Sequence, residues 1–240
     1  MTQFRPSSYN SLPTIIKNLL IINGLMFLAQ NTIAGPTSAF SFEDIFALHA
    51  FQSDLFRPWQ LITHMFLHGD LGHIFGNMLA LWMFGSILEN IWGPKQFLLF
   101  YFLCGVGAAM IHLGILSFEL MDATKYYHEL ITSGATQTAD AIDFMARYKA
   151  RIDVATLGAS GAVFGILIAF VYLFPNTYIY IYFFIPMKAK WLGILYFSYE
   201  LFFALKNSAG DNVARWAHVG GALVGFVLVY IWKKRNRRFY

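Results

Sequence analysis

Six apolar runs, most of them long enough to cross a lipid bilayer, dominate this sequence of 240 residues. A membrane-spanning helix needs about 20 mainly apolar residues. Only 12% of the residues are charged, whereas soluble domains carry about 25%. The chain therefore lacks the polar surface of a soluble enzyme, a disordered protein or a nucleic-acid-binding arm, and we expect an integral membrane protein. The runs cover residues 14–34, 71–92, 96–117, 158–174, 191–206 and 213–232.

Two long connections join these runs. In residues 35–70, Ser41 and Asp44 have capping-box spacing, which predicts a short helix. The Phe, Leu and Trp content of this connection favours a position in the plane of the membrane interface. Residues 118–157 are the most polar part of the chain and predict an amphipathic surface helix. Its helical spacing is carried by Ile142, Met145, Ala146, Lys149 and Ile152.

A shorter connection alternates β-branched and aromatic residues from Thr177 to Pro186, which predicts extended backbone. Extended backbone facing lipid would leave its amides unpaired, so we expect this segment at the interface and packed against protein. Together, the runs and connections predict one all-α membrane domain over residues 1–240, a six-helix bundle with an interfacial first loop.

Charge is distributed unevenly between the two sides of such a bundle. With six spans, the side that holds both termini carries ten basic residues and one acidic residue, Glu89. The other side carries seven basic and twelve acidic residues. The positive-inside rule then predicts cytoplasmic termini, and we expect the cell membrane as the location. The basic tail over residues 233–240 fits an orientation signal that contacts lipid headgroups, and we expect no nucleic-acid partner.

Polar side chains cluster at the start of the second run. His64 and His68 are four residues apart, as are His73 and Asn77, so each pair shares a face if its segment is helical. A bilayer excludes such groups unless something uses them. A lone histidine is more often a structural hydrogen-bonding residue, and a metal site is another reading. No cysteine or carboxylate joins the histidines at ligand spacing, so we expect no metal and no cofactor.

The fourth run begins with a serine among glycines. Ser160 follows Gly158, and Gly161 and Gly165 form a GxxxG pair, which is typical of membrane helices that approach closely. Taken alone the motif is weak, because serine is common in membrane helices, where its hydroxyl bonds to the preceding turn.

The sixth run carries a histidine on a face of small residues. At 100° per residue, Gly221, Ala222 and Gly225 all lie within about 60° of His218 on the helix wheel. A face of this kind admits a neighbouring backbone into side-chain contact. A histidine on it needs a hydrogen-bond partner, and Ser160 beside its own GxxxG pair is the best-placed hydroxyl.

These residues together predict nucleophilic catalysis. A serine hydroxyl needs a base to take its proton, and His218 is the candidate base for Ser160. Attack on a carbonyl creates an oxyanion that needs fixed donors, which we assign to His73, Asn77 and Gly158. The sequence offers no obvious intramembrane carboxylate to orient the histidine, so we expect a Ser–His dyad and not a triad.

The motifs resemble those of the rhomboid family of intramembrane serine proteases. The resemblance runs from Arg57 to Gly225 and includes an H-x-x-x-N signature ending at Asn77, a G-x-S-G motif around Ser160 and an A-H-x-x-G motif around His218. Each motif alone is weak to moderate. Their order in the second, fourth and sixth runs is specific. The 118–157 connection departs from the basic bacterial form by its length.

The resemblance implies a helical bundle with a water-filled site below the outer surface, Ser160 as nucleophile and His218 as general base. It also implies that the Ser160 backbone N–H helps His73 and Asn77 to stabilise the oxyanion. The 35–60 loop would lie partly in the outer leaflet, and the fifth span with the 207–212 loop would control substrate access. Arg57 and Glu89 would be structural ion-pairing residues.

Three functions remain open from the sequence. The first is hydrolysis of a peptide bond in a membrane-protein substrate within the bilayer, without a small-molecule cofactor. The second is a catalytically silent relative that acts as a membrane chaperone or binding protein. The third is a proton-coupled transporter with histidine relays, for which the chain shows no inverted repeat.

Overall fold

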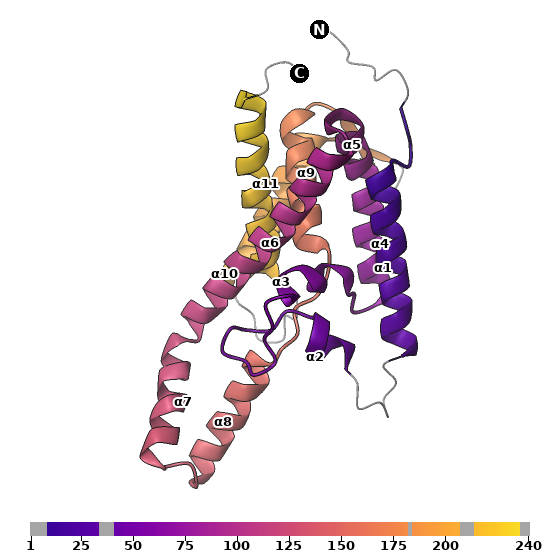
Figure 1. Ribbon diagram of the computed structural model, residues 1–240. Helices are drawn as coiled ribbons and strands as arrows, with labels where there is room; N and C mark the ends of the chain where they lie inside the picture. Colours follow the sequence, from indigo (N-terminus) through magenta and orange to yellow (C-terminus); the bar gives the residue numbers. More distant parts are fainter. Residues whose placement is uncertain (1–8, 34–40, 182–183, 207–213, 236–240) are drawn as a thin grey trace.

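The computed structural model describes residues 9–33, 41–181, 184–206 and 214–235 and is mainly helical (Figure 1). The apolar runs form helices within a few residues of their predicted bounds. The predicted run 71–92 is one continuous rod of two α-helical parts joined by a π-helical turn, η2. The helices are α1 (Thr14–Thr32), α4 (Leu71–Ala80), η2 (Leu81–Gly85), α5 (Ser86–Trp92), α6 (Pro94–Glu119), α9 (Ser160–Leu173), α10 (Ala189–Lys206) and α11 (Arg215–Arg235).

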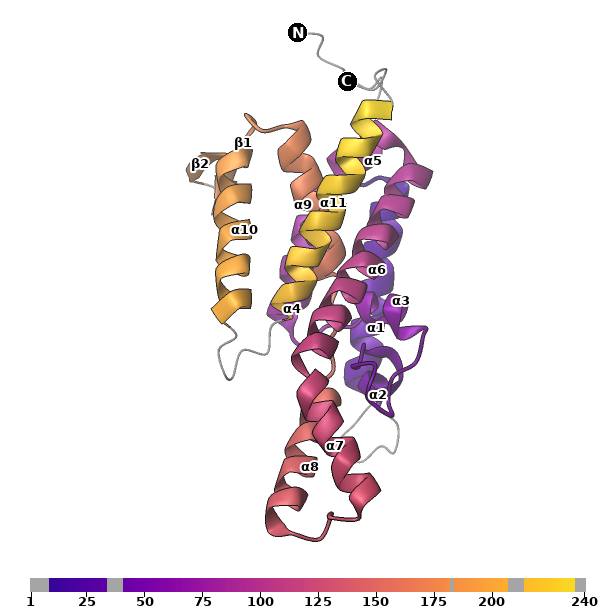
Figure 2. The same cartoon turned by 90° about the vertical axis from the view of Figure 1, so that its left-hand side faces the viewer.

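Three helical segments of the described chain are long and apolar enough to cross a membrane by length and composition: Leu71–Trp92, Pro94–Glu119 and Arg215–Lys234. The shorter α9 is apolar on every side and is buried over most of its surface, as expected for a helix enclosed by others. It packs between α6 and α11, while α10 stands to one side of the bundle (Figure 2). The helix that carries Ser160 is therefore the centre of the fold.

The contact between α9 and α11 is made through glycine. A Cβ added to Gly221 would overlap the carbonyl oxygen of Gly161. A Cβ at Gly225 would lie 2.5 Å from the Cα of Gly165. The small-residue faces of α9 and α11 therefore meet, as predicted, and their backbones are in direct contact.

The first connection contains the predicted short helix, α2 (Phe42–Phe46), followed by α3 (Gln60–Thr63) and the 3₁₀ turn η1 (His64–Phe66). The hydroxyl of Ser41 accepts the Asp44 backbone N–H at 3.1 Å, so the predicted cap is confirmed. Leu48 forms an isolated antiparallel bridge with Thr156, just before α9. Residues 34–40 lie outside the described part of the chain, so that part of the predicted 35–60 loop is not described.

The expected ion-pairing roles of Arg57 and Glu89 are different in the structure. Arg57 donates hydrogen bonds to the backbone carbonyls of Asp54 and Phe56. The buried Glu89 accepts the backbone N–H groups of Ile15 and Ile16, each at 2.9 Å. A carboxylate there satisfies donors in the first turn of α1, which have no acceptor within their own helix. Glu89 therefore caps α1.

The polar connection 118–157 folds into a helical hairpin of α7 (Met121–Ser133) and α8 (Ala139–Ile152), which projects from one end of the bundle (Figure 1). The sequence predicted one amphipathic helix where there are two. The predicted face is right at Ile152, which is buried, and wrong at Ile142, which is exposed, while Ala141 and Tyr148 are buried instead. Tyr148 stacks on Tyr127 of α7, and this contact turns the side of α8 that carries Ala141 and Tyr148 toward α7.

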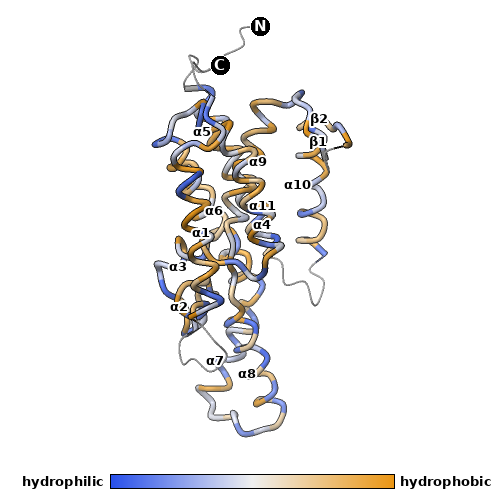
Figure 3. The backbone as a smooth tube through the Cα atoms, turned by 90° about the vertical axis from the view of Figure 1, so that its right-hand side faces the viewer, coloured by the Kyte–Doolittle hydropathy of each residue, from blue (hydrophilic) through white to orange (hydrophobic). Residues whose placement is uncertain are grey.

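The segment predicted to be extended forms a β-hairpin of β1 (Tyr178–Ile181) and β2 (Ile185–Lys188), with Tyr178 paired to Lys188. Pairing between the two strands satisfies only the backbone amides that face the partner strand. The side chains of Tyr178, Tyr180 and Ile185 are exposed, so the predicted packing against protein is not found at these residues. The β-hairpin and the α7–α8 hairpin lie at opposite ends of the molecule, and hydrophilic residues recur along α7 and α8 (Figure 3). The predicted 207–212 loop and most of the basic tail, residues 236–240, lie outside the described residues.

Candidate active site

Ser160 is the first residue of α9, at the end of the bundle nearest to the α7–α8 hairpin. The chain reaches it through Gly158, whose φ of +127° is a conformation that side chains other than glycine rarely adopt. A Cβ at Gly158 would lie 2.8 Å from the Cε1 and Nε2 atoms of His73. Glycine is therefore required twice, for the turn and for the closeness of the imidazole.

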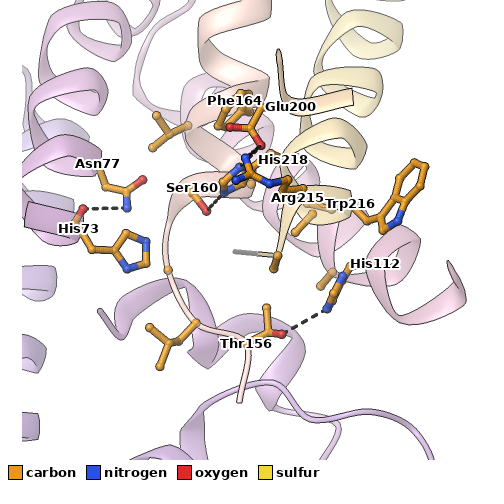
Figure 4. A pocket seen from close by; sticks show the side chains of 18 of the residues that line it. His73, Asn77, His112, Thr156, Ser160, Phe164, Glu200, Arg215, Trp216 and His218 are labelled. Atoms are coloured by element: carbon orange, nitrogen blue, oxygen red, sulfur yellow. Dashed lines mark hydrogen bonds and ion pairs between the residues drawn. The ribbon is translucent and has the colours of Figure 1, made fainter. Parts of the chain in front are cut away.

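His218 lies in the first turn of α11 and faces Ser160 (Figure 4). Its Nε2 is 2.9 Å from the Ser160 Oγ, although the two residues are 58 positions apart in the sequence. Phe164 stacks on the imidazole with ring centroids 4.5 Å apart and planes 13° apart. Phe164 follows Ser160 by one helical turn, so α9 supplies both the hydroxyl and the surface that fixes the ring.

The other imidazole nitrogen meets a carboxylate that the sequence interpretation missed. Glu200 of α10 is buried, and its Oε2 lies 3.0 Å from His218 Nδ1. The same oxygen accepts a hydrogen bond from the Arg215 guanidinium at 3.3 Å. The statement that no intramembrane carboxylate faces the histidine is therefore wrong. The signal was present, because an ionisable residue inside an apolar run indicates a functional site.

His73 and Asn77 lie on the opposite side of Ser160 from His218 (Figure 4). Asp70 caps α4 by accepting the His73 backbone N–H at 2.8 Å, which fixes the start of the helix. The His73 Nδ1 accepts the Gly69 N–H at 3.4 Å, so the neutral ring carries its proton on Nε2, the atom beside Gly158. Asn77 donates one amide N–H to the His73 carbonyl at 3.0 Å and keeps a second.

The structure uses the Gly158 N–H for a different purpose from the one that the sequence suggested. This N–H donates to the carbonyl oxygen of His64 at 2.9 Å. A donor engaged in this way is not free for an oxyanion. The backbone N–H of Ser160 belongs to the first turn of α9, where no acceptor exists within the helix. Gly158 therefore shapes the turn, and Ser160 presents the donor.

His64 and His68, which precede α4, are buried beside the site. Burial lowers the pKa of each imidazole to about 4, because a charged ring loses its hydration there. Both are therefore neutral near pH 7. The His64 Nδ1 donates to the Gln60 carbonyl at 2.7 Å, which fits a structural hydrogen-bonding role.

One cavity of about 1120 Å³ is lined by the residues around Ser160: His64, His73, Asn77, Gly158, Phe164, Glu200, Arg215 and His218. It extends from His218 and Ser160 past His112, whose Nε2 lies 3.2 Å from the Thr156 hydroxyl, to Glu119 and Arg151 at the base of the α7–α8 hairpin. A hydroxyl, an imidazole and spare N–H donors around one cavity form the arrangement that acyl transfer requires.

Comparison with known proteins identifies the family. Residues 56–235 match the Rhomboid domain family. The chain belongs to the rhomboid family. The matched range contains every residue that lines the cavity except Leu48, which lies before residue 56. The rhomboid resemblance proposed from the sequence motifs is therefore confirmed.

Several curated rhomboid proteins are similar to this chain. RHOMBOID-like protein 12, mitochondrial, of Arabidopsis thaliana is 32% identical over 76% of this chain and 49% of its own length. Rhomboid protein 1, mitochondrial, of Saccharomyces cerevisiae is 28% identical over 74% of this chain and 44% of its own length. Rhomboid protease AarA of Providencia stuartii is 27% identical over 88% of this chain and 69% of its own length. The chain thus spans about half the length of the first two relatives.

The same comparison corrects the expected location. The charge distribution predicted the cell membrane as the location, with cytoplasmic termini. Four relatives, two from Arabidopsis thaliana and one from each of two yeasts, are named as mitochondrial rhomboid proteins. Assignment to the cell membrane was wrong because a charge asymmetry orders the two sides of a membrane without identifying that membrane.

Proposed function

We propose that this rhomboid protein is an intramembrane serine endopeptidase in which Ser160 is the nucleophile and His218 is the general base. One observation carries the proposal: the 2.9 Å contact between His218 Nε2 and Ser160 Oγ, made by residues on separate helices. Family membership supports it, because relatives include proteins named as rhomboid proteases. The buried setting supports it as well, since a bilayer protein keeps such polar groups for function.

Acylation follows from this geometry. His218 Nε2 takes the proton from Ser160 Oγ as the oxygen forms a bond to the scissile carbonyl carbon. The carbonyl π electrons move to its oxygen, which becomes an oxyanion. When the oxyanion collapses, the C–N bond breaks, and the His218 imidazolium gives its proton to the departing amine. The products are an acyl ester on Ser160 and a free amino terminus.

Deacylation repeats the sequence with water. His218 takes a proton from a water molecule that attacks the ester carbon, and then returns the proton to Ser160 Oγ as the C–O bond breaks. Water must therefore reach the dyad. The cavity of about 1120 Å³ offers that route, because it contains Ser160 and opens toward the polar α7–α8 hairpin.

We infer that three donors stabilise the oxyanion. These are the His73 Nε2–H, the second amide N–H of Asn77 and the backbone N–H of Ser160. The His73 ring is held by the hydrogen bond from the Gly69 N–H, and the Asn77 amide is held by its bond to the His73 carbonyl. The Ser160 N–H is fixed by the start of α9. Little reorganisation of these donors is therefore needed in the transition state.

The placement of these groups in the membrane is part of the proposal. We infer six spans, made by α1, α4–α5, α6, α9, α10 and α11, with the first connection in the interface. The 14 residues of α9 span about 21 Å at 1.5 Å per residue, which is less than the roughly 30 Å hydrocarbon core. Ser160, at the start of this short helix, would therefore lie below the surface. We infer a mitochondrial membrane from the names of the relatives.

Substrates would be membrane proteins whose cleavage segment unwinds. A helix hides its carbonyls in backbone hydrogen bonds, so a cleavable segment should contain small or helix-breaking residues. The loosely packed α10 and the 207–212 loop are the elements that we infer to control access. No cofactor enters this mechanism.

Substitution of Ser160 by alanine tests the proposal. The purified protein should cleave a single-span substrate with a helix-destabilised segment, and a fluorophosphonate should label Ser160. Ser160→Ala should abolish both while the protein stays folded. The matched control is Ser86→Ala, which removes a buried serine hydroxyl that donates to the Ser11 carbonyl at the other end of the bundle. Cleavage that persists in Ser160→Ala would overturn the assignment.

A further inference from the structure

A carboxylate inside an apolar helix requires an explanation. Glu200 lies in α10 among aromatic and aliphatic residues, and only 5% of its side chain is exposed. Burial of an ionised carboxylate is costly unless the charge is paired and hydrogen-bonded. Tyr196, Glu200 and Phe203 are spaced by about one turn, and all three line the cavity that contains Ser160. The charge therefore faces the site and not lipid.

The contact of Glu200 determines which imidazole nitrogen is protonated. An ionised glutamate only accepts hydrogen bonds. Its Oε2 is 3.0 Å from His218 Nδ1, so Nδ1 must carry the proton in this contact. The Nε2 lone pair then points at the Ser160 hydroxyl 2.9 Å away. Figure 4 shows the contacts that join the side chains of Ser160, His218 and Glu200 in one line. A proton on Nδ1 leaves Nε2 free to accept the serine proton.

We propose that Glu200 is the positioning residue of His218, so that the site works as a Ser160–His218–Glu200 triad instead of a dyad. The inference rests on the proposed function of Ser160 and His218. The carboxylate fixes the ring orientation and the Nδ1–H tautomer, and it stabilises the imidazolium that forms when Nε2 takes the serine proton. Glu200 itself exchanges no proton in this scheme.

The other role open to Glu200 is that of counter-ion for Arg215. The guanidinium lies 3.3 Å from the same oxygen, and it also sits over the rings of Tyr199 and Phe203, at 5.4 and 5.0 Å from their centroids. The shorter contact of Glu200 is with His218. Neutralising the charge of Arg215 would not require that His218 also contact the Ser160 hydroxyl. The two roles differ in which step of catalysis they affect.

The kinetic test uses two substitutions of Glu200 in the full-length protein. Loss of the carboxylate from a Ser-His-Asp triad costs about 10⁴-fold in kcat. Here Phe164 also holds the ring, so Glu200→Gln should lower kcat by about 100-fold and change KM less than about threefold. Glu200→Asp keeps the charge and should recover at least about tenfold of that loss. The proposal is overturned if Glu200→Gln keeps wild-type kcat, or if Glu200→Asp is no better than Glu200→Gln.

A matched control changes Glu89, which is also a buried carboxylate in an apolar helix. Glu89→Gln replaces one of the two oxygens that accept α1 backbone N–H groups by an amide NH2 and removes the charge, so it should lower the melting temperature and leave kcat of the folded protein within about twofold of wild type. An equal fall of kcat in Glu89→Gln and Glu200→Gln would assign the effect to folding and overturn the positioning role.

A second measurement does not depend on activity or on how the Glu200 variants fold. Protein labelled with ¹⁵N-histidine reports the tautomer of each imidazole, and His218→Ala identifies the His218 signals. We expect Nδ1–H and unprotonated Nε2 at His218, and the Nε2–H tautomer would overturn the inference. If the Nδ1–H tautomer is found but Ser160 is neither labelled by fluorophosphonate nor needed for cleavage, the proposed function fails while the Glu200 contact stands.

Discussion

At the scale of single residues, the geometry around Ser160 depends on a glycine that donates nothing to the reaction. Gly158 has a φ of +127°, and its N–H is used by the His64 carbonyl. A side chain at this position would strain the backbone by about 1–3 kcal/mol. It would also push the His73 ring away from the site.

Gly158→Ala should therefore lower kcat by at least about tenfold, since 1.4 kcal/mol corresponds to a factor of ten. The measurement is turnover of a single-span substrate together with the rate of fluorophosphonate labelling. Gly134→Ala is the matched control, because Gly134 also has a positive φ, +71°, but lies at the tip of the α7–α8 hairpin. The control should lose some stability and keep its kcat. A Gly158→Ala variant with wild-type kcat would contradict this account.

Asn77 offers a second test at this scale. Asn77→Ala removes one of the three proposed oxyanion donors, and loss of one such donor costs about 10²–10³-fold in kcat. We expect a fall of this size in kcat with little change in KM, and activity that is reduced but measurable. Asn90→Ala serves as the control, because its amide binds the Ser86 carbonyl at the far end of the same rod. An unchanged kcat in Asn77→Ala would exclude it as a donor.

Ser160 and His218 could be predicted from the sequence because each stands beside glycines at helical spacing. Their neighbours explain why a hydroxyl and an imidazole can approach each other. Glu200 has no such local pattern: it lies 18 residues before His218, in a run rich in aromatic residues. Its partner is set by the angle between α10 and α11, which is a tertiary property that no single segment encodes.

At the scale of elements, the site depends on how closely α9 and α11 approach. Ser160 and His218 lie at the start of their helices, and the glycine contacts follow within one or two turns. A small separation of the two helices would move the imidazole away from the hydroxyl. The distance between His218 Nε2 and Ser160 Oγ is therefore set by how closely α9 and α11 pack.

Gly221→Ala tests this coupling. An added methyl at Gly221 meets the backbone carbonyl of Gly161, which cannot move without α9. We expect a lower melting temperature and a fall in fluorophosphonate labelling of at least about tenfold. Gly114→Ala in α6 is the control, because its Cβ would meet no atom within 4 Å, and it should label at the wild-type rate. Equal labelling of the two variants would show that the glycine contact does not set the distance.

The sequence predicted where helices and strands form better than it predicted which of their faces are buried. Apolar length predicted helices in the six runs, capping chemistry predicted α2, and alternation predicted the extended backbone of the β-hairpin, and each of these segments has that structure. The predicted face of α8 is wrong at Ile142, because Tyr148 stacks on Tyr127 of α7 and Phe144 packs edge-on against Tyr126. A helical period fixes which residues share a face, but the partner helix decides which face is covered.

At the scale of the whole molecule, the α7–α8 hairpin is the part that departs most from a compact bundle. Lys149 forms an ion pair with Asp54 of the first connection at 2.8 Å, and Ser53 hydrogen-bonds Asp153. The hydrogen bond to Lys149 and its charge lower the pKa of Asp54, and Asp54 raises the pKa of Lys149. The pair therefore stays charged near pH 7. These contacts attach the hairpin to the first connection and not to α9, α10 or α11.

The dyad should therefore survive removal of the hairpin. Replacing residues 122–150 with a short Gly/Ser linker keeps Glu119 and Arg151, which line the cavity and pair at 3.4 Å. Fluorophosphonate labelling of Ser160 should stay within about threefold of the full chain, because Ser160, His218 and Glu200 are held by α9, α11 and α10. A labelling rate that falls by more than tenfold in a folded variant would mean that the hairpin supports the site through the Leu48–Thr156 bridge, which connects the first connection to the start of α9.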